Sequence, residues 1–67
     1  MKVKNHIKQH RARLDWTQQD LAERIGISRQ SISSIEKGYH LPSILLCLKI
    51  ANAMGTRLDN LFELKEK

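Results

Sequence analysis

Residues that interrupt helices are few in this 67-residue chain, and their positions limit the folds that it can adopt. Glycine occurs only at Gly26, Gly38 and Gly55, and proline occurs only at Pro42. A glycine that follows an apolar stretch can take the left-handed backbone conformation that ends a helix. Apolar side chains recur at helical spacing between these residues, so the sequence predicts a series of short helices.

Polar residues that favour helix N-termini precede most of the predicted helices. Thr17 and Thr56 each have an aspartate three residues later, which is close to the spacing of a capping box. Ser28 and Ser43 are two further N-cap candidates. The predicted helices cover about residues 5–14, 18–25, 29–37, 44–54 and 58–62.

The predicted fold is therefore all-α, with five helices in one domain that spans residues 1–67. The sequence also allows residues 1–3 and 62–64 to pair as a short two-stranded antiparallel sheet. A chain of this length buries only about 60% of its unfolded surface, so its stability is marginal unless something helps.

The positive charge of the chain is concentrated at one end. Lys and Arg number 12 and Asp and Glu number 7, which leaves a net charge of +5. Residues 1–13 carry basic side chains and no acidic ones, while the rest of the chain is balanced. A basic domain of this size suggests an anionic partner such as nucleic acid or a membrane surface. The alternative is that the charge serves solubility alone.

Several classes of protein are excluded by composition. A single cysteine cannot form an internal disulfide, which excludes a secreted disulfide scaffold. No apolar run approaches the ~20 residues that span a bilayer, and the basic N-terminus lacks the apolar region of a signal peptide. We therefore expect a small soluble protein in the cytoplasm.

Residues 17–37 have the organisation of a helix-turn-helix. The small side chain of Ala22 allows two helices to cross closely, and Gly26 permits a sharp turn between them. Ile32 and Ile35 place the apolar side of the second helix against the core. At ~100° per residue the opposite side of that helix is polar and free of acidic residues. It carries Gln30, Ser33, Ser34 and Lys37, with Arg29 at its N-terminal edge.

Those side chains suit contact with DNA. Arginine can pair with guanine through two hydrogen bonds, and glutamine can do the same with adenine. Short neutral serines let a helix approach base edges closely. The alternative is an ordinary solvated helix surface, since polar outward residues are the default.

The run from Thr17 to Gly38 resembles the Cro/lambda-repressor (XRE-type) helix-turn-helix family. The resemblance continues through Pro42–Ser43, Leu48–Ala51 and Leu58–Phe62, and covers about residues 5–62. It implies a five-helix lambda-repressor-like domain that binds double-stranded DNA in a sequence-specific manner and regulates transcription.

The resemblance also implies roles for single residues. Arg29, Gln30 and Ser34 match base-reading positions, and Ser33 lies close to them. Ser34 is shorter than the residue that several relatives carry, so it reaches a base only through water. Arg11 and Glu36 match a structural ion pair. The implied phosphate contacts are Gln18, Ser28, Lys37, Tyr39 and His40.

The helix predicted at 44–54 carries two apolar stripes, and residues 44–64 are the predicted dimerisation region. Ile44, Cys47, Leu48 and Ala51 form the stripe expected to face the core. A second stripe faces elsewhere, and a small domain cannot cover it fully. We expect it to form a two-fold contact, with packing of the last helix over it as the alternative. The predicted contacts are Leu46, Ile50, Ala53, Leu58, Leu61 and Leu64.

Two functions fit these features. The first is a transcriptional regulator, expected to be a repressor that binds a palindromic operator as a homodimer. The second is an antitoxin or other protein-interaction module of the same fold, which binds a partner protein.

Other activities are not indicated. His6 and His10 have a spacing that can hold a metal, but no acidic residue or cysteine lies near them, so we expect two solvated histidines and no metal. Cys47 has no evident activating base, and we expect it to be a buried, inert thiol. Trp16 either packs at the start of the second helix, which we favour, or lies near DNA. We expect no enzymatic activity, no cofactor and no small-molecule ligand.

Overall fold

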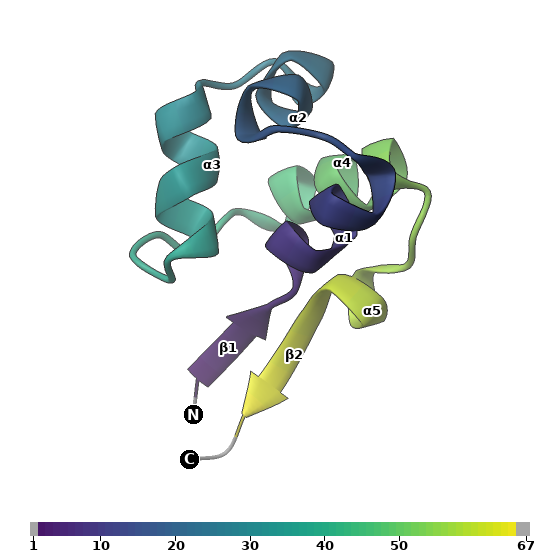
Figure 1. Ribbon diagram of the computed structural model, residues 1–67. Helices are drawn as coiled ribbons and strands as arrows, with labels where there is room; N and C mark the ends of the chain where they lie inside the picture. The colour runs from purple at the N-terminus through teal and green to yellow at the C-terminus, as the bar shows by residue number, and fades with distance from the viewer. Residues whose placement is uncertain (1, 66–67) are drawn as a thin grey trace.

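The computed structural model describes residues 2–65, which form five helices and a two-stranded sheet (Figure 1). The predicted all-α fold with a small terminal sheet is confirmed. The elements in chain order are β1 (Lys2–Asn5), α1 (Ile7–Leu14), α2 (Gln18–Ile25), α3 (Arg29–Glu36), α4 (Ile44–Met54), α5 (Leu58–Leu61) and β2 (Phe62–Lys65).

Local side-chain chemistry sets most of the helix ends. At the start of α2 the Asp20 backbone N–H donates to Thr17 Oγ1 at 3.0 Å, and the Thr17 N–H donates to the Asp20 carboxylate at 2.8 Å. Ser28 and Ser43 cap α3 and α4 in the same manner through their hydroxyl oxygens. Gly26 ends α2 with a φ of 76°, the left-handed conformation that glycine tolerates best.

The predicted cap at Thr56 is wrong. Helix α5 begins after Arg57, which makes no side-chain capping bond. The Thr56 hydroxyl lies 3.5 Å from His10 Nε2 instead, and Asp59 pairs with Arg57 at 3.3 Å. Thr56 and Asp59 thus have the sequence spacing of a capping box, but Thr56 is not the N-cap residue and no capping bond forms.

The sheet joins the two ends of the chain. Strands β1 and β2 are antiparallel, with Val3 opposite Leu64 and Asn5 opposite Phe62. The first strand extends two residues beyond the predicted range, and Met1, which was predicted to belong to it, lies outside the described residues. Asn5 Nδ2 also donates to the Ile35 carbonyl at 2.9 Å. The strand is thereby tied to the last turn of α3.

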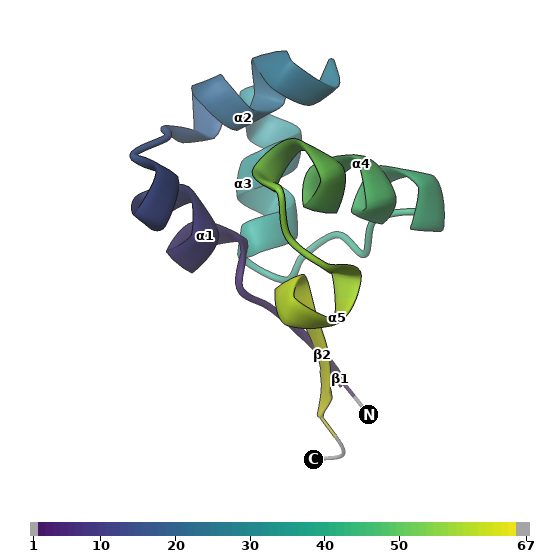
Figure 2. The same ribbon diagram turned by 90° about the vertical axis from the view of Figure 1, so that its right-hand side faces the viewer.

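The core lies where α1, α2, α3, α4 and α5 meet, as the two views show (Figures 1 and 2). Ile32 and Ile35 anchor α3 to this core, as predicted, and are at most 1% exposed. Ala22 is fully buried where α2 packs against α3. The buried apolar residues are Ile7, Leu21, Ala22, Ile25, Ile32, Ile35, Ile50, Ala51, Met54 and Leu61.

The buried side of α4 differs from the prediction. Ile44 and Leu48, expected in the core, are 68% and 50% exposed, while Ile50, Ala51 and Met54 are buried. Leu48 lies ~160° from Ile50 around a helix of 3.6 residues per turn. Because α4 is apolar around most of its circumference, periodicity alone cannot identify which side faces the core.

The predicted dimer contact is wrong for two of its residues, because they belong to the core. Ile50 and Leu61 are completely buried within the chain. Leu46 and Ala53 are half-buried and pack against the core. The physical reason is that α5 packs across this side of α4 (Figure 2). The remaining predicted contacts are Leu58, which is half-buried, and Leu64, which is exposed.

Substitution in α4 tests which side is buried. We expect Ile50→Ala to lower the free energy of unfolding by about 3 kcal/mol, because it leaves a cavity in the core. Leu48→Ala, on the opposite side of the helix, should change it far less. Urea denaturation followed by circular dichroism measures both, and equal losses in the two variants would contradict the assignment.

The capping box makes stability depend on pH. The Thr17 backbone N–H and, secondarily, its hydroxyl hold the pKa of Asp20 below its ordinary value of 3.8. A carboxyl with a lowered folded pKa contributes stability that is full above its ordinary pKa and is lost as the pH falls through the lower folded value.

We therefore expect Asp20→Asn to be less stable than the wild type at neutral pH and to approach it at acidic pH. Thermal unfolding of both proteins at pH ~6 and pH ~2.5 measures the difference between their melting temperatures. A difference that is the same at both pH values would rule out this role for Asp20.

Candidate nucleic-acid interface

The turn between α2 and α3 is held by backbone hydrogen bonds and one apolar side chain. The N–H groups of Gly26 and Ile27 both donate to the Ala22 carbonyl, at 2.9 and 3.0 Å. The Ile27 side chain is half-buried and packs against the core. These contacts fix the angle at which α3 leaves α2.

Helix α3 lies at one edge of the molecule, and no described helix or strand covers its outer side (Figure 1). Arg29 and Gln30 are exposed on this helix, while Ser33 and Ser34 are half-buried. The side chains that extend furthest from the α3 backbone are therefore those of Arg29 and Gln30, at its N-terminal end. Ser33 and Ser34 follow them, and their short side chains allow a ligand to approach the backbone in the middle of the helix.

The end of α3 and the loop after it present the remaining predicted contacts. Lys37 caps the helix and is exposed, as are Tyr39 and His40. Tyr39 is 82% exposed, so its ring is available for contact with a ligand.

An open hollow lies beside the exposed side of α3. Ser31 lines it and was missed by sequence reasoning because its angular position on the helix is close to that of the core. Its backbone N–H donates to Ser28 Oγ at 3.1 Å, so Ser31 lies beside the residue that caps α3. The hollow is lined by Ser28, Gln30, Ser31, Ser34 and His40.

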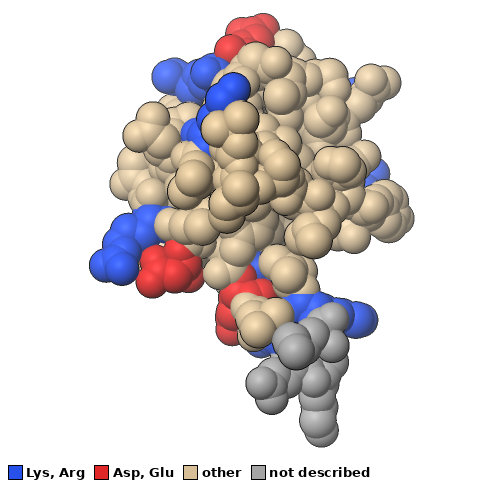
Figure 3. Space-filling model, turned by 180° about the vertical axis from the view of Figure 1, so that it is seen from behind, with Lys and Arg blue, Asp and Glu red and all other residues tan. Residues whose placement is uncertain are grey.

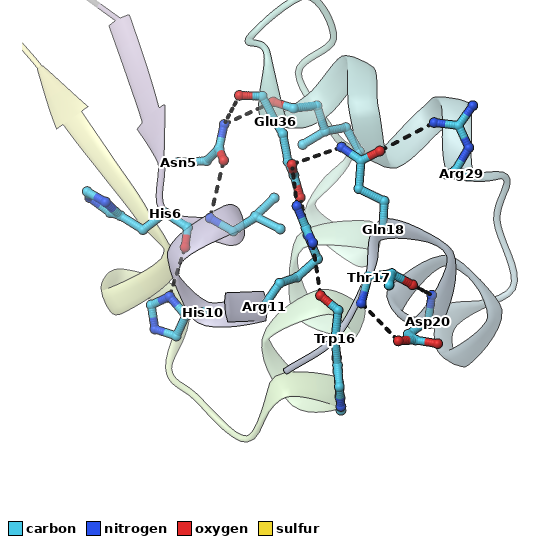
Figure 4. A network of polar contacts seen from close by, with 12 residues as sticks. Asn5, His6, His10, Arg11, Trp16, Thr17, Gln18, Asp20, Arg29 and Glu36 are labelled. Carbon is cyan, nitrogen blue, oxygen red and sulfur yellow. Dashed lines mark hydrogen bonds and ion pairs between the residues drawn. The ribbon is translucent and has the colours of Figure 1, made fainter. Parts of the chain in front are cut away.

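A polar network connects the inside of the domain to this surface (Figure 4). The ion pair implied by the resemblance is present, with Arg11 Nε 2.6 Å from Glu36 Oε2 and Arg11 Nη2 3.1 Å from Oε1. The two side chains are only 12% and 8% exposed. Arg11 also donates to the Trp16 carbonyl at 2.9 Å. Arg11 is therefore held inside the fold and is not part of an exposed basic surface.

Gln18 extends the network to the outer side of α3. Its Nε2 donates to Glu36 Oε1 at 3.1 Å, and its Oε1 lies 3.4 Å from Arg29 Nη1, which donates to it. An amide nitrogen has two N–H groups, so one remains for an outside acceptor. The Gln18 backbone N–H, in the first turn of α2, also lacks an acceptor within the helix. Both groups suit a phosphate oxygen.

Trp16 packs against the core, and the Arg24 guanidinium stacks over its ring at 4.1 Å from the ring centre. The structure thus agrees with packing at the start of α2. A cation held over an aromatic face contributes about 0.5–1 kcal/mol at an exposed site.

The histidines and the cysteine make ordinary contacts. His6 Nε2 pairs with Glu63 at 3.0 Å, and this hydrogen bond holds the pKa of Glu63 below its usual value. His10 Nδ1 lies 2.9 Å from the His6 carbonyl. Cys47 is half-buried rather than buried, and burial raises the pKa of its thiol. Residues 2–65 hold no group of three or more potential metal-ligating side chains.

The sequence profile of a family described as helix-turn-helix matches residues 7–61. The chain belongs to the helix-turn-helix family. This match includes both helices of the motif and the helices that support them, and it confirms the resemblance to regulators of the Cro/lambda-repressor type.

Individual proteins of this family are similar along nearly the whole chain. The HTH-type transcriptional regulator YgzD of Bacillus subtilis is 42% identical over 65 residues, which cover 97% of this chain and 98% of YgzD. The cryptic phage CTXphi transcriptional repressor RstR of Vibrio cholerae is 36% identical over 91% of this chain and 54% of RstR. The crystal structure of a Bacteroides fragilis protein superposes with a TM-score of 0.83 at 28% identity, over 91% of this chain and 98% of that one.

None of the described helices has both the length and the apolar character needed to cross a membrane. The longest of them, α4, has 11 residues.

The network predicts a large effect of a single charge change at Glu36. We expect Glu36→Gln to lower the free energy of unfolding by about 3 kcal/mol, because it leaves the Arg11 charge buried without a counter-ion. Urea denaturation measures this loss.

Asp59→Asn provides a matched control, because it breaks an ion pair with Arg57 in which both side chains are more than 70% exposed. Exposed pairs contribute little to stability. The interpretation fails if Glu36→Gln unfolds at the same urea concentration as Asp59→Asn.

Proposed function

We propose that this protein binds double-stranded DNA in a sequence-specific manner through α3 and represses transcription. The observation that carries the proposal is the outer side of α3, which is polar, uncovered and anchored from beneath by Ile32 and Ile35. A helix of this kind fits the major groove, which is about 12 Å wide.

The long side chains at the start of α3 read the base edges. Arg29 donates two hydrogen bonds to a guanine, and Gln30 pairs with an adenine. Ser33 and Ser34 lie near the next base pairs, where the short Ser34 acts through a bridging water.

The backbone contacts flank the readers. Gln18 and Ser28 lie at the N-terminal ends of α2 and α3, where helix dipoles and free N–H groups favour a phosphate. Lys37, Tyr39 and His40 follow the other end of α3 and contact the next stretch of sugar-phosphate backbone.

A homodimer on a palindromic operator completes the proposal. Two copies related by a two-fold axis place their α3 helices ~34 Å apart, one turn of DNA, so that each reads one half-site. The repressor role is supported by the similarity to the phage repressor RstR.

In vitro selection from random DNA at ~0.15 M salt, read by sequencing, tests this proposal. We expect an enriched palindrome. Recovery of sequences with no shared pattern would overturn sequence-specific binding.

Two substitutions separate base reading from phosphate contact. Arg29→Ala should cost about 1–3 kcal/mol on the selected operator and relax the preference at one base position. Lys37→Ala should weaken binding to all sequences about equally and reduce the dependence of affinity on salt. Titration of operator and mutated operators by fluorescence anisotropy measures both. Unchanged affinity and specificity in both variants would contradict the docking of α3.

A further inference from the structure

A hollow with apolar walls and basic side chains lies where β1 meets the end of α3. Its walls come from β1, the last turn of α3, the loop after it and the first residue of β2, and β1 lies beside the end of α3 in Figure 1. Its volume is about 510 Å³, within the ~300–1,000 Å³ of pockets that bind small molecules. We call it the β1 hollow.

We propose that the β1 hollow binds a small carboxylate with an apolar body, and that the bound carboxylate weakens the contact with DNA. The second part rests on the proposed function, whereas the first part does not. This site departs from the sequence-based expectation that the chain has no small-molecule ligand.

The apolar walls come from residues that are far apart in the sequence. Ile35 and Pro42 are buried and Phe62 is half-buried, so they form the inner part of the β1 hollow. Val3 and Leu41 are 45% and 70% exposed and line its outer part. A ligand that covers Val3 and Leu41 removes their apolar surface from water, which favours binding.

The charged side chains of the β1 hollow are of one sign. Lys2 and Lys37 line it and are exposed, and in the part of the chain that the structure describes no Asp or Glu lines it. Glu36, next to Lys37 in the sequence, directs its carboxylate to Arg11 and Gln18 instead. An ammonium group donates charge-assisted hydrogen bonds to a carboxylate. Ammonium groups beside apolar walls fit an anion with an apolar body better than they fit inorganic phosphate.

The wall between β1 and α3 is held in place without a ligand. Asn5 Nδ2 donates to the carbonyls of Ile35 and Glu36, at 2.9 and 3.4 Å, and Asn5 Oδ1 accepts from the Ile7 N–H at 3.3 Å. Asn5 also lies opposite Phe62 in the sheet. A pocket whose walls are already ordered loses less conformational entropy when it binds a ligand.

Other surfaces fit a carboxylate less well. The open hollow between α5 and the sheet also has apolar walls, but Asp59 and Glu63 line it and repel an anion. Viewed from behind, the molecule carries its charged side chains around the rim and not at the centre (Figure 3). The centre of that face therefore offers an anion no cation.

A further hollow, beside Arg24 and Lys49, is basic but has fewer apolar walls. Of the described residues, Ile25 and Ala53 supply its apolar side chains. The Arg24 guanidinium already stacks over the Trp16 ring. This hollow therefore offers less to the apolar body of a ligand.

Two side chains of the β1 hollow are also proposed phosphate contacts. Lys37 and His40 line it and follow α3. A carboxylate bound to Lys37 engages an amine that otherwise contacts a phosphate, and it adds negative charge beside the DNA backbone. The effect is reciprocal, so the carboxylate and DNA weaken one another's binding by the same factor.

Titration of the full-length protein with naphthoate, an aromatic carboxylate, tests the site. We expect saturable changes in the NMR shifts of the backbone amides, concentrated at residues 2–5, 35–42 and 62. Uncharged naphthamide should bind on the order of tenfold more weakly, because it forms no charge-assisted hydrogen bond. Inorganic phosphate should also bind more weakly than naphthoate, because it has no apolar body.

Substitutions test the charged and the apolar part of the site separately. Lys2→Gln removes a cation and Leu41→Ala removes an apolar wall, and each should weaken naphthoate binding on the order of fivefold. Lys65→Gln and Leu45→Ala should bind naphthoate as the wild type does. Lys65 is a matched control because it lies opposite Lys2 in the sheet, and neither control residue lines the hollow. All four residues are exposed, so we expect unchanged circular dichroism spectra.

Fluorescence anisotropy with the selected operator tests the second part of the proposal. Saturating naphthoate should lower the operator affinity of the wild type on the order of tenfold. Sodium chloride at equal ionic strength, or naphthamide at equal concentration, should lower it far less. Leu41→Ala should bind the operator as the wild type does without naphthoate, and should respond less at the concentration that half-saturates the wild type.

The outcomes separate this inference from the proposed function. Shift changes centred on α4 or on the hollow beside Arg24, or equal binding of naphthoate and naphthamide, would overturn the site. Equal losses in Lys2→Gln and Lys65→Gln would do the same. Naphthoate that occupies the β1 hollow without changing operator affinity would overturn the effect on DNA binding. The NMR titration uses no DNA, so a failure of sequence-specific DNA binding overturns the proposed function and leaves the carboxylate site in place.

Discussion

The ion pair between Arg11 and Glu36 is the interaction on which the arrangement of the domain depends. Helices of eight residues are not stable alone in water, so α1, α2 and α3 form only when packed together. Apolar packing among isoleucines and leucines holds the helices together but does little to fix their relative orientation. The ion pair fixes that orientation, because its hydrogen bonds form at only one relative placement of α1 and α3. The hydrogen bond from Arg11 to the Trp16 carbonyl then fixes the position of the segment that leads into α2.

That placement explains how a chain this small can hold the outer side of α3 in a fixed orientation. The last turn of α3 is tied to β1 by Asn5, its middle rests on Ile32 and Ile35, and its first turn is capped by Ser28. Because α3 is attached at its middle and at its last turn, and the cap keeps its first turn helical, the helix has little freedom to tilt. Its outer side chains are therefore displayed on a rigid support, which a site that discriminates between similar ligands requires.

Much of the fold was predictable from sequence because short-range chemistry sets it. Capping at Thr17 and the glycine at Gly26 act within one helical turn, so the limits of α2 follow from neighbouring residues. The burial of α4 does not. Ile50 and Leu48 are both apolar and lie on opposite sides of the helix, and only the packing of α1, α2 and α5 against α4 decides between them. The role of Gln18 between Glu36 and Arg29 was likewise hidden, because it links residues far apart in sequence.

The hydrogen bond from Arg29 to Gln18 has a consequence for how the surface can change over time. An arginine that is oriented before its ligand arrives loses less conformational entropy on binding, an effect known as preorganisation. Since Gln18 is itself held by Glu36, the conformation of Arg29 depends in part on a residue inside the domain, away from the outer side of α3. Substitutions in the interior can thus retune what the outer surface selects, which opens a route to new specificity that leaves the contacting residues in place.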